Sequence, residues 1–450
     1  MRKLLSDVAD RAHRYSESMS TRRVFPSAEA IERLKLLQVP LQDEPIEPDT
    51  VLAELDEIGS PATVATTGGR YFGFVVGGSL PAAMAANMLA GAWDQNAARV
   101  LSPIASSLED VCIGWLISLL GLPPNVGAGF VTGATMANFS GLAAARHALL
   151  AQRGWDAEAR GLFGAPPITV VVGEEVHVSV LKALSMLGLG WDRVVRVPVD
   201  GQGRMRAEKL PDISGPTIVC IQAGNVNTGA FDPAEEICET AREREAWVHV
   251  DGAFGLWALA SPERAHLANG VLDADSWATD GHKWLNVPQD SGIAFVRHAD
   301  HLRAAMSATA AYLIEGVGRE PYHYTPEMSR RARGIEIWAA LRSLGRSGLA
   351  DLVERTCLYA AQFAQALEAA GYEILNDVVL NQVLVSFGSA DLTRRVIARL
   401  QEDGTAWFGG TEWQGHHAMR ISVSSWATTE EDVQRCLDVI VRIAREEAKR

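Results

Sequence analysis

The sequence predicts an α/β fold that consists of a large, mostly parallel β-sheet with helices on both faces and a smaller C-terminal α/β domain. Two observations support this prediction. Between about residues 70 and 300, short apolar runs rich in β-branched residues alternate with segments whose apolar residues recur at helical spacing. This alternation is typical of a parallel sheet that is covered on both faces. From about residue 345 onward, the order is helix, strand, helix, strand, helix.

The expected elements follow in chain order. The first 60 or so residues are helical and polar, and prolines at 26, 40, 45 and 48 interrupt them, which predicts an arm without a core of its own. Strands are predicted at residues 168–172, 194–197, 217–221, 247–250 and 292–296, and helices at 137–150, 176–189 and 233–245. Further helices are predicted at 349–370, 392–402 and 430–447, and further strands at 382–387 and 419–424. The chain thus divides into an N-terminal helical arm (1–65), a large α/β domain (66–345) and a small α/β domain (346–450).

The composition excludes several classes of protein. The 450 residues include 41 Lys+Arg and 55 Asp+Glu, for a net charge of −14, which argues against nucleic acid and anionic membranes as partners. The apolar runs are too short, or too broken by Gly and Pro, to span a bilayer, and the N-terminus lacks the apolar core of a signal peptide. The five cysteines show no metal-binding spacing. We therefore expect reduced thiols, no metal site and a cytoplasmic location.

The strongest local signal is the run Asp280-Gly281-His282-Lys283-Trp284. A His-Lys pair taken alone is usually a solvated surface dipeptide. Here it follows a segment that looks buried, and the apolar pair Trp284-Leu285 comes directly after it. Partial removal of water lowers the pKa of a lysine and leaves a free amine, which can form a Schiff base with an aldehyde.

A second signal is the run His249-Val250-Asp251-Gly252-Ala253, in which Asp251 follows a predicted strand. A carboxylate at the end of a buried strand is costly unless it is paired. The protonated pyridine nitrogen of pyridoxal phosphate (PLP) is such a partner, because this cofactor withdraws electrons only while that nitrogen keeps its proton. The alternative is an aspartate that caps the following loop.

Three further motifs lie beside predicted strands. The turn TGATMAN (132–138) leads into a helix whose N-terminus suits a phosphate group, although a plain capped turn fits the same pattern. His177 is either a ring that stacks on an aromatic group or a structural histidine. Asn225 either donates to a phenolate or carboxylate or only shapes its turn. Because all five motifs lie next to strands of one sheet, they indicate a single cofactor site at the carboxyl edge of that sheet.

With these motifs, the chain resembles the group II PLP-dependent amino-acid decarboxylases, the family of the aromatic-L-amino-acid and glutamate decarboxylases. The resemblance covers nearly the whole chain, and the run from Asp251 through Lys283 is highly specific for this group. The other segments that carry it include RVFPS (23–27), YFGF (71–74), SPIASSLED (102–110), EEVHVSVLKA (174–183), GAFDP (229–233) and MRISVSSWATTEEDV (419–433). The resemblance implies the fold type I (aspartate aminotransferase-like) architecture, with PLP bound by the large domain.

The resemblance also implies roles for individual residues. Lys283 would hold the cofactor as a Schiff base, and Asp251 would pair with the ring nitrogen. Ala253 would pack against the ring. His177 would stack on the ring and help to position the substrate carboxylate. The implied reaction converts an L-amino acid to the amine and CO2. Aminotransferase, aldehyde synthase and carbon–carbon lyase chemistry are the alternatives on the same fold.

The phosphate of the cofactor would be bound by the turn and by the residue before the lysine. Gly133, Ala134, Thr135 and His282 are the residues implied. Asn225 stands where the family usually has threonine, near the cofactor hydroxyl, and an amide can make the same hydrogen bond.

Residues outside the cofactor site are expected to govern proton transfer and substrate choice. Tyr322 and Tyr324 are the candidates for the loop tyrosine that protonates the substrate carbon in this family, and the alternative is that both are ordinary loop aromatics. Arg420 either grips a substrate carboxylate or supports the site. Phe74 and Trp93 are expected at the entrance, which favours a bulky or aromatic substrate, unless they belong to the core. The family also implies a homodimer with active sites at the interface and the arm exchanged.

Overall fold

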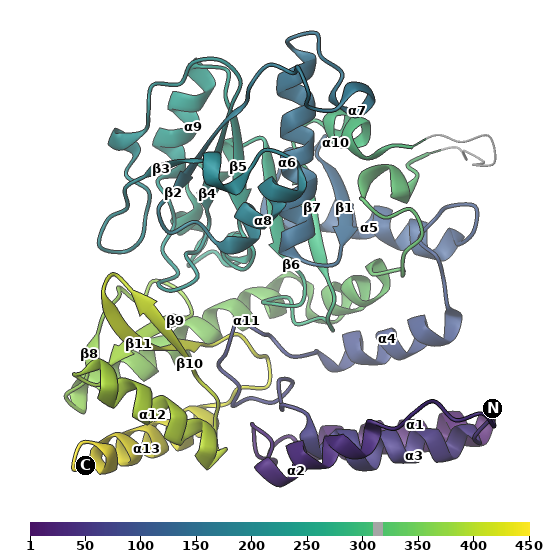
Figure 1. Cartoon of the computed structure of the whole chain (residues 1–450), viewed down its shortest axis with the longest axis vertical. Coiled ribbons are helices and arrows are strands. Elements are labelled where there is room, and N and C mark those ends of the chain that lie inside the picture. Colours follow the sequence, from purple (N-terminus) through teal and green to yellow (C-terminus); the bar gives the residue numbers. More distant parts are fainter. Residues whose placement is uncertain (309–317) are drawn as a thin grey trace. The chain divides into compact units, whose positions relative to one another are not determined.

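In a computed structural model of the chain, residues 1–308 and 318–450 are described (Figure 1). The contacts between Cα atoms divide the chain into two units. The first consists of Met1–Val76, Tyr359–Leu375 and Val383–Arg450, and the second of Gly77–Leu358 and Asn376–Gln382. The functional division into an arm and two domains, with boundaries near residues 65 and 345, stays a prediction.

The second unit is built on a seven-stranded sheet in the order β1-β7-β6-β5-β4-β2-β3. Its strands are β1 (Gly127–Val131), β2 (Thr169–Gly173), β3 (Val195–Val197), β4 (Thr217–Gln222), β5 (Trp247–Asp251), β6 (Ser276–Asp280) and β7 (Gly292–Val296). The strand β7 runs antiparallel to both of its neighbours, β1 and β6, and all other pairs in this sheet are parallel, so the predicted mostly parallel sheet is confirmed. Every residue of β1, β4, β5, β6 and β7 is buried, which means that both faces of the sheet are covered.

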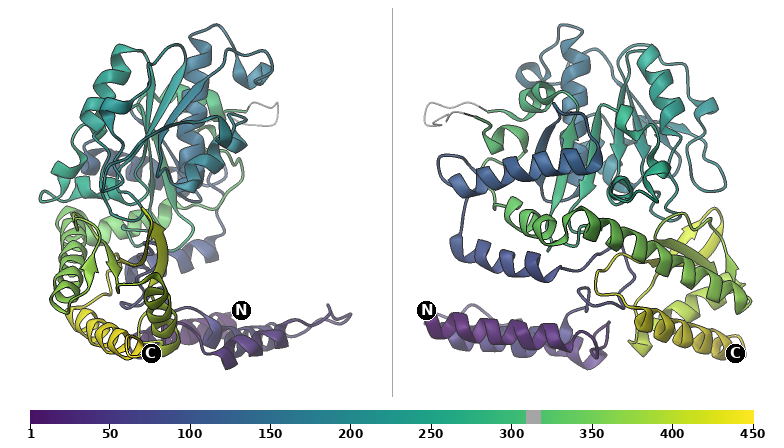
Figure 2. Two further views of the ribbon diagram at one scale, coloured as in Figure 1. Left: turned by 60° about the vertical axis from the view of Figure 1, so that its left-hand side comes forward. Right: turned by 180° about the vertical axis from the view of Figure 1, so that it is seen from behind.

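Helices flank this sheet on both sides (Figure 2). The helices of this unit up to residue 306 are α4 (Pro81–Trp93), α5 (Pro103–Leu120), α6 (Ala134–Ala151), α7 (Ala157–Arg160), α8 (Val178–Met186), α9 (Ala234–Glu243) and α10 (Ala299–Met306), and α4 lies apart from the sheet. The long α11 (Gly334–Ala369) bends at Gly345, whose φ of 60° favours glycine. The helix α6 packs against β5, β6 and β7, and its apolar side joins α8 and β2 in one core cluster. The N-terminus of α6 is thereby held at the edge of the sheet.

The first unit contains the N-terminal helices and a four-stranded sheet in the order β10-β11-β9-β8. The helices at its start are α1 (Arg2–Ser18), α2 (Ala28–Arg33) and α3 (Pro48–Gly59). Pro48 is the first residue of α3, where a proline has no hydrogen bond to lose, so it begins a helix instead of interrupting one. The remaining elements are β8 (Glu373–Ile374), β9 (Gln382–Ser386), α12 (Ala390–Asp403), β10 (Gly409–Trp413), β11 (His416–Ser422) and α13 (Glu430–Glu447).

The sequence prediction missed the strands β1, β6, β8 and β10. The two that belong to the seven-stranded sheet, β1 (GAGFV) and β6 (SWATD), contain glycine, serine and aspartate, which have low strand propensity, and their burial in the sheet overrides that propensity. The prediction of unpaired cysteines is confirmed, since all five are free and buried.

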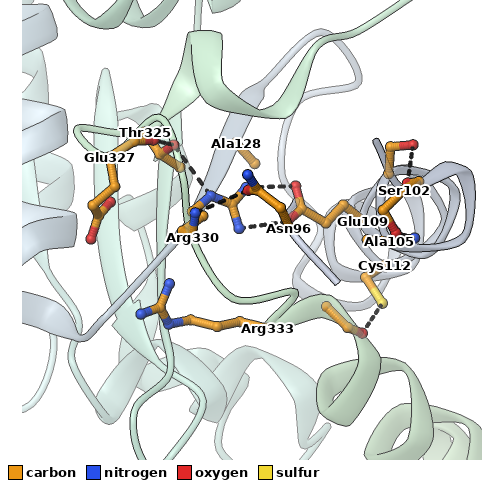
Figure 3. Close-up of polar contacts among 12 residues, drawn as sticks. Asn96, Ser102, Ala105, Glu109, Cys112, Ala128, Thr325, Glu327, Arg330 and Arg333 are labelled. Carbon is orange, nitrogen blue, oxygen red and sulfur yellow. Dashed lines mark hydrogen bonds and ion pairs between the residues drawn. The ribbon is translucent and has the colours of Figure 1, made fainter. Parts of the chain in front are cut away.

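One helix, α5, is long and apolar enough to cross a membrane by these two criteria alone. It carries Glu109, which is fully buried and forms an ion pair of 2.7 Å with Arg330, whose side chain is 1% exposed. Figure 3 shows this pair, with Arg330 also donating to Thr325 and its backbone N–H donating to Asn96. These contacts tie α5 to the rest of its unit, as expected of a helix that packs in the protein core.

Candidate active site

The carboxyl ends of β4, β5 and β6, together with the N-termini of α6 and α8, enclose a cavity of about 340 Å³ in the second unit. This volume is in the range of small-molecule sites. The structure brings eight of the predicted cofactor residues to the wall of this cavity, namely Gly133, Ala134, Thr135, His177, Asp251, Ala253, His282 and Lys283. These residues therefore lie together at the carboxyl edge of the sheet, and their role in binding the cofactor stays a prediction.

Asp251 is the last residue of β5 and is 5% exposed. Its Oδ2 accepts from Asn138 Nδ2 at 3.3 Å and from Ser179 Oγ at 3.5 Å, and its Oδ1 accepts from the Ala253 N–H at 3.3 Å. All three donors are neutral, and within residues 1–308 and 318–450 Asp251 forms no ion pair. A buried carboxylate with only neutral partners fits a cationic ligand atom such as a protonated ring nitrogen.

Lys283 reaches the same cavity from the loop after β6. Trp284, which follows it, is fully buried and donates to Thr356 Oγ1 at 2.9 Å, so the backbone beneath the lysine is anchored. The Lys283 side chain is 19% exposed, and its Nζ lies 3.3 Å from Asp280 Oδ2. This ion pair with Asp280 was not predicted, although Asp280 belongs to the motif that indicated Lys283.

The turn before α6 approaches β7 closely. A Cβ atom at Gly292 would lie 2.5 Å from the Gly133 backbone, so only glycine allows this approach. The backbone N–H of Ala134, the first residue of α6, donates to Asp280 Oδ1 at 2.6 Å. Thr135 and His282 line the cavity beside it, and His282 Nδ1 lies 2.7 Å from the Ser291 carbonyl oxygen. The N-terminal end of α6 thus faces the cavity with a helix dipole that favours an anion.

His177 caps the N-terminus of α8. Its Nδ1 accepts from the Ser179 backbone N–H at 3.2 Å and lies 2.8 Å from Ser179 Oγ. Since Ser179 also contacts Asp251, the imidazole and the carboxylate share one hydroxyl neighbour. Sequence reasoning did not identify Ser179, and the signal for it was its position two residues after His177.

Asn225 does not line the cavity, contrary to the expectation that its amide meets the cofactor. The residue is 1% exposed; its Nδ2 donates to Glu175 Oε2 at 3.0 Å, and its Oδ1 accepts from the Asn227 N–H at 2.8 Å. The amide therefore closes its own turn, as asparagine often does. Gln222, Gly224 and Val226 line the cavity in its place.

The residues predicted for proton transfer and substrate binding lie elsewhere in the described structure. Tyr322 packs edge-on against His323, the Tyr324 ring lies 4.6 Å from the Arg319 guanidinium, and neither tyrosine lines the cavity. Trp93 is the last residue of α4 and is 45% exposed. Phe74 and Arg420 belong to the first unit. The roles of all five residues stay predictions.

A histidine that sequence reasoning did not assign lies directly behind the site. His249 is fully buried, and burial lowers its pKa to about 4 from the ordinary 6.5. As the pH falls from 7 toward 4, the unfolded chain takes up a proton at His249 that the folded chain does not, which removes stability. In urea unfolding, we expect the stability difference between wild type and His249→Gln to shrink by about 2 kcal/mol from pH 7 to pH 5.

The comparison of wild type with His249→Gln cancels the contributions of other groups that titrate in this range, because both proteins contain them. Burial raises the pKa of Asp232 to about 6, but both proteins contain Asp232, so its contribution cancels. A stability difference that stays constant between pH 7 and pH 5 would contradict the neutral state of His249.

Comparison with known proteins places this site in a family. Residues 32–388 match the model of the pyridoxal-dependent decarboxylase conserved domain. The chain is 26% identical over 354 residues to an aromatic-L-amino-acid decarboxylase of Bacillus atrophaeus, which covers 73% of this chain and 72% of that one. It is 29% identical over 391 residues to an L-2,4-diaminobutyrate decarboxylase of Rhizobium meliloti, which covers 80% of this chain and 74% of that one.

The fold agrees with this assignment. The crystal structure of Oryza sativa TDC with PLP and tryptamine superposes with a TM-score of 0.91 at 22% identity and covers 99% of this chain and 97% of that chain. The family match spans most of the sequence, including the buried Asp251 and the cavity-lining Lys283. The chain therefore belongs to the group II PLP-dependent amino-acid decarboxylases, and its cofactor is pyridoxal 5′-phosphate.

Proposed function

We propose that this enzyme decarboxylates a bulky or aromatic L-amino acid to the corresponding amine and CO2, with Lys283 and Asp251 as its central catalytic residues. The observation that carries this proposal is the Asp251 carboxylate, which is 5% exposed, has only neutral donors and lines the same cavity as Lys283. When bound, PLP draws electrons from the bonds at the substrate Cα, so that the carboxylate can leave as CO2.

The residues of the cavity have separate tasks in this proposal. The Lys283 amine would hold the cofactor by its aldehyde carbon and would take up or return a proton at Nζ. Asp251 would keep the ring nitrogen protonated, and His177 and Ala253 would pack against the ring. Thr135, His282 and the N-terminus of α6 would hold the phosphate.

Asp280 adds a task that the family resemblance did not suggest. Its carboxylate contacts both Lys283 Nζ and the Ala134 N–H, so it holds the lysine beside the phosphate-binding helix. Because the Ala134 N–H is already engaged, the phosphate depends on the other donors of the first turn of α6. Asp280 thus keeps Lys283 in position until the cofactor arrives.

The preference for a large substrate rests on an aromatic group in the first unit. The rings of Tyr71 and Trp407 stack at a centroid distance of 5.1 Å, and Phe74, which is 61% exposed, lies 5.4 Å from Trp407. Burial raises the pKa of Tyr71 to about 12 and lowers the pKa of Arg420, which is close to it. The exposed ring of Phe74 suits an aromatic or bulky side chain, and Arg420 suits the substrate carboxylate.

The decisive experiment is a panel of aromatic, acidic and diamino L-amino acids in which CO2, amine, aldehyde and O2 are followed together. We expect equal amounts of CO2 and amine, with the highest kcat/KM for an aromatic substrate. Aldehyde formed with consumption of O2 would indicate aldehyde synthase chemistry instead. Tyr322→Phe and Tyr324→Phe should be assayed in parallel, because unchanged product identity and rate in both would remove them as proton donors.

We also propose that the enzyme is a cytoplasmic homodimer. The helices α4 and α5 contribute Ala90 and Ala105 to one buried cluster with Ala332 and Ile335. Along these two helices and the segment between them, large apolar residues are exposed, namely Met84, Met88, Leu89, Trp93, Val100, Leu101, Ile104, Val111 and Trp115, and we take them together as one apolar surface. A surface of this kind usually marks an interface, and a second copy is the partner that the family implies. Five free thiols are consistent with a reducing compartment.

A charge in this apolar surface should disrupt the dimer. We expect Leu89→Asp to shift the protein from dimer to monomer in light scattering, because burying an unpaired carboxylate at an interface is costly. Phe163→Asp is the matched control, since Phe163 is 98% exposed and lies outside the surface. A wild-type protein that is monomeric at working concentration would overturn the proposal.

A further inference from the structure

A continuous chain of hydrogen bonds leads from the interior of the second unit to Asp251. Trp247 Nε1 donates to Ser276 Oγ at 2.8 Å, and Ser276 Oγ lies 2.8 Å from His249 Nδ1. His249 Nε2 lies 2.8 Å from Asn138 Oδ1, and Asn138 Nδ2 donates to Asp251 Oδ2 at 3.3 Å. The five residues come from α6, β5 and β6, which pack together, and all of them are buried.

The chemistry of the side chains fixes the direction of every bond in this chain. The indole of Trp247 can only donate, and a carboxylate can only accept. The oxygen of Asn138 accepts, so His249 must carry its proton on Nε2. In a neutral imidazole, Nδ1 then accepts from the Ser276 hydroxyl. The pKa of His249, lowered to about 4 by burial, keeps the ring neutral above that pH. All donors therefore point toward Asp251.

A glycine in α6 leaves room for the imidazole of His249. A Cβ atom at Gly141 would lie 2.7 Å from His249 Cε1 and 2.8 Å from His249 Nδ1, which no ordinary packing allows. Gly141 lies one turn after Asn138 on the same face of the helix. Asn138, which binds the imidazole of His249, and Gly141, which leaves room for it, thus lie in a single turn of α6.

We propose that Asn138 and His249 are positioning residues that hold the Asp251 carboxylate at the cofactor ring through this one-directional hydrogen-bond chain. The proposal rests on the role proposed above for Asp251. Asn138 occupies the central place, since its Nδ2 also lies 3.2 Å from Ser179 Oγ, the hydroxyl that contacts His177 Nδ1. One amide therefore orients the carboxylate and, through Ser179, the imidazole on the cavity wall.

The test compares Asp251→Asn, Asn138→Ala and the control Asn381→Ala, which also removes a fully buried asparagine but lies outside the cavity. PLP is removed from each holoenzyme and titrated back, and the visible absorption band of the bound cofactor is recorded. We expect Asn138→Ala to weaken PLP binding roughly tenfold to a hundredfold, as for hydrogen bonds to a charged group. The band should move in the same direction as in Asp251→Asn, and Asn381→Ala should resemble wild type.

A double variant separates positioning from a general effect on the fold. If Asn138 acts through Asp251, both substitutions remove the same interaction with the cofactor. Adding Asn138→Ala to Asp251→Asn should then weaken PLP binding little further. Additive losses, or an Asn138→Ala protein whose affinity and spectrum match Asn381→Ala, would overturn the inference and leave the role of Asp251 intact. Unchanged binding and spectrum in Asp251→Asn would instead overturn the proposed function.

A milder variant decides the matter if Asn138→Ala does not fold. Ser276→Ala removes only the hydroxyl that donates to His249 Nδ1. We expect it to weaken PLP binding roughly twofold to tenfold, the range for a neutral hydrogen bond, and to move the absorption band in the same direction. A Ser276→Ala protein that folds and binds PLP with the wild-type affinity and spectrum would contradict the chain.

Discussion

Replacement of Lys283 by alanine is expected to abolish the covalent attachment of PLP and to reduce decarboxylation by roughly a thousandfold or more. A single positioned proton-transfer group contributes about 10²–10⁴-fold to a rate, and Lys283 also supplies the amine that forms the link. Reduction with borohydride followed by mass spectrometry measures the link directly. Wild type should carry one pyridoxyl group on Lys283, and the variant should carry none.

Two controls make this result specific. Lys283→Arg retains the positive charge beside Asp280 but has no nucleophilic amine, so it should fold like wild type and still form no adduct. Asp280→Asn should retain the adduct, because it leaves the amine in place. Full turnover in Lys283→Ala would refute the assignment of the site.

Loss of the Glu109 carboxylate is expected to give the largest change in stability. Arg330 is almost completely buried and pairs with Glu109 at 2.7 Å (Figure 3). Arg319 lies 3.4 Å from the same carboxylate. Removing one member of a buried pair leaves an uncompensated charge and costs about 3–5 kcal/mol. Urea unfolding followed by tryptophan fluorescence should show this loss in Glu109→Gln.

An exposed ion pair and a double variant test the physical cause. Asp273 pairs with Arg242 at 3.4 Å with both side chains more than half exposed, so Asp273→Asn should cost at most about 1 kcal/mol. Replacing both Glu109 and Arg330 by methionine should recover much of the loss, because an apolar pair of similar volume needs no counter-charge. Equal losses in Glu109→Gln and Asp273→Asn would show that burial is not the cause.

The sequence contained enough local information to locate most of the site. Asp251 ends β5 and Lys283 follows β6, and these strands are parallel neighbours, so both residues reach the same edge of the sheet. The turn before α6 was identified from the helix that it begins, and His177 from its position after a predicted strand. The family resemblance then indicated the cofactor and the reaction, which the spacing of hydrophobic residues does not predict.

The strands that were missed have a common cause. The segments GAGFV and SWATD carry few β-branched residues, and only their pairing and burial in the sheet make them extended. Asp280 lies at the end of β6, and the error therefore concealed its position beside Lys283 and the N-terminus of α6.

What the sequence by itself determined about this protein is the order of strands and helices, the edge at which the motifs meet, and the family. Only the tertiary structure decided the direction of individual side chains. In the folded chain, the Asn225 side chain hydrogen-bonds within its own loop. Asn138 contacts Asp251, which lies 113 residues further along the chain. The physical reason is that hydrophobic periodicity reflects local conformation, whereas the partner of a buried polar group is set by whatever donors and acceptors packing brings within about 3 Å.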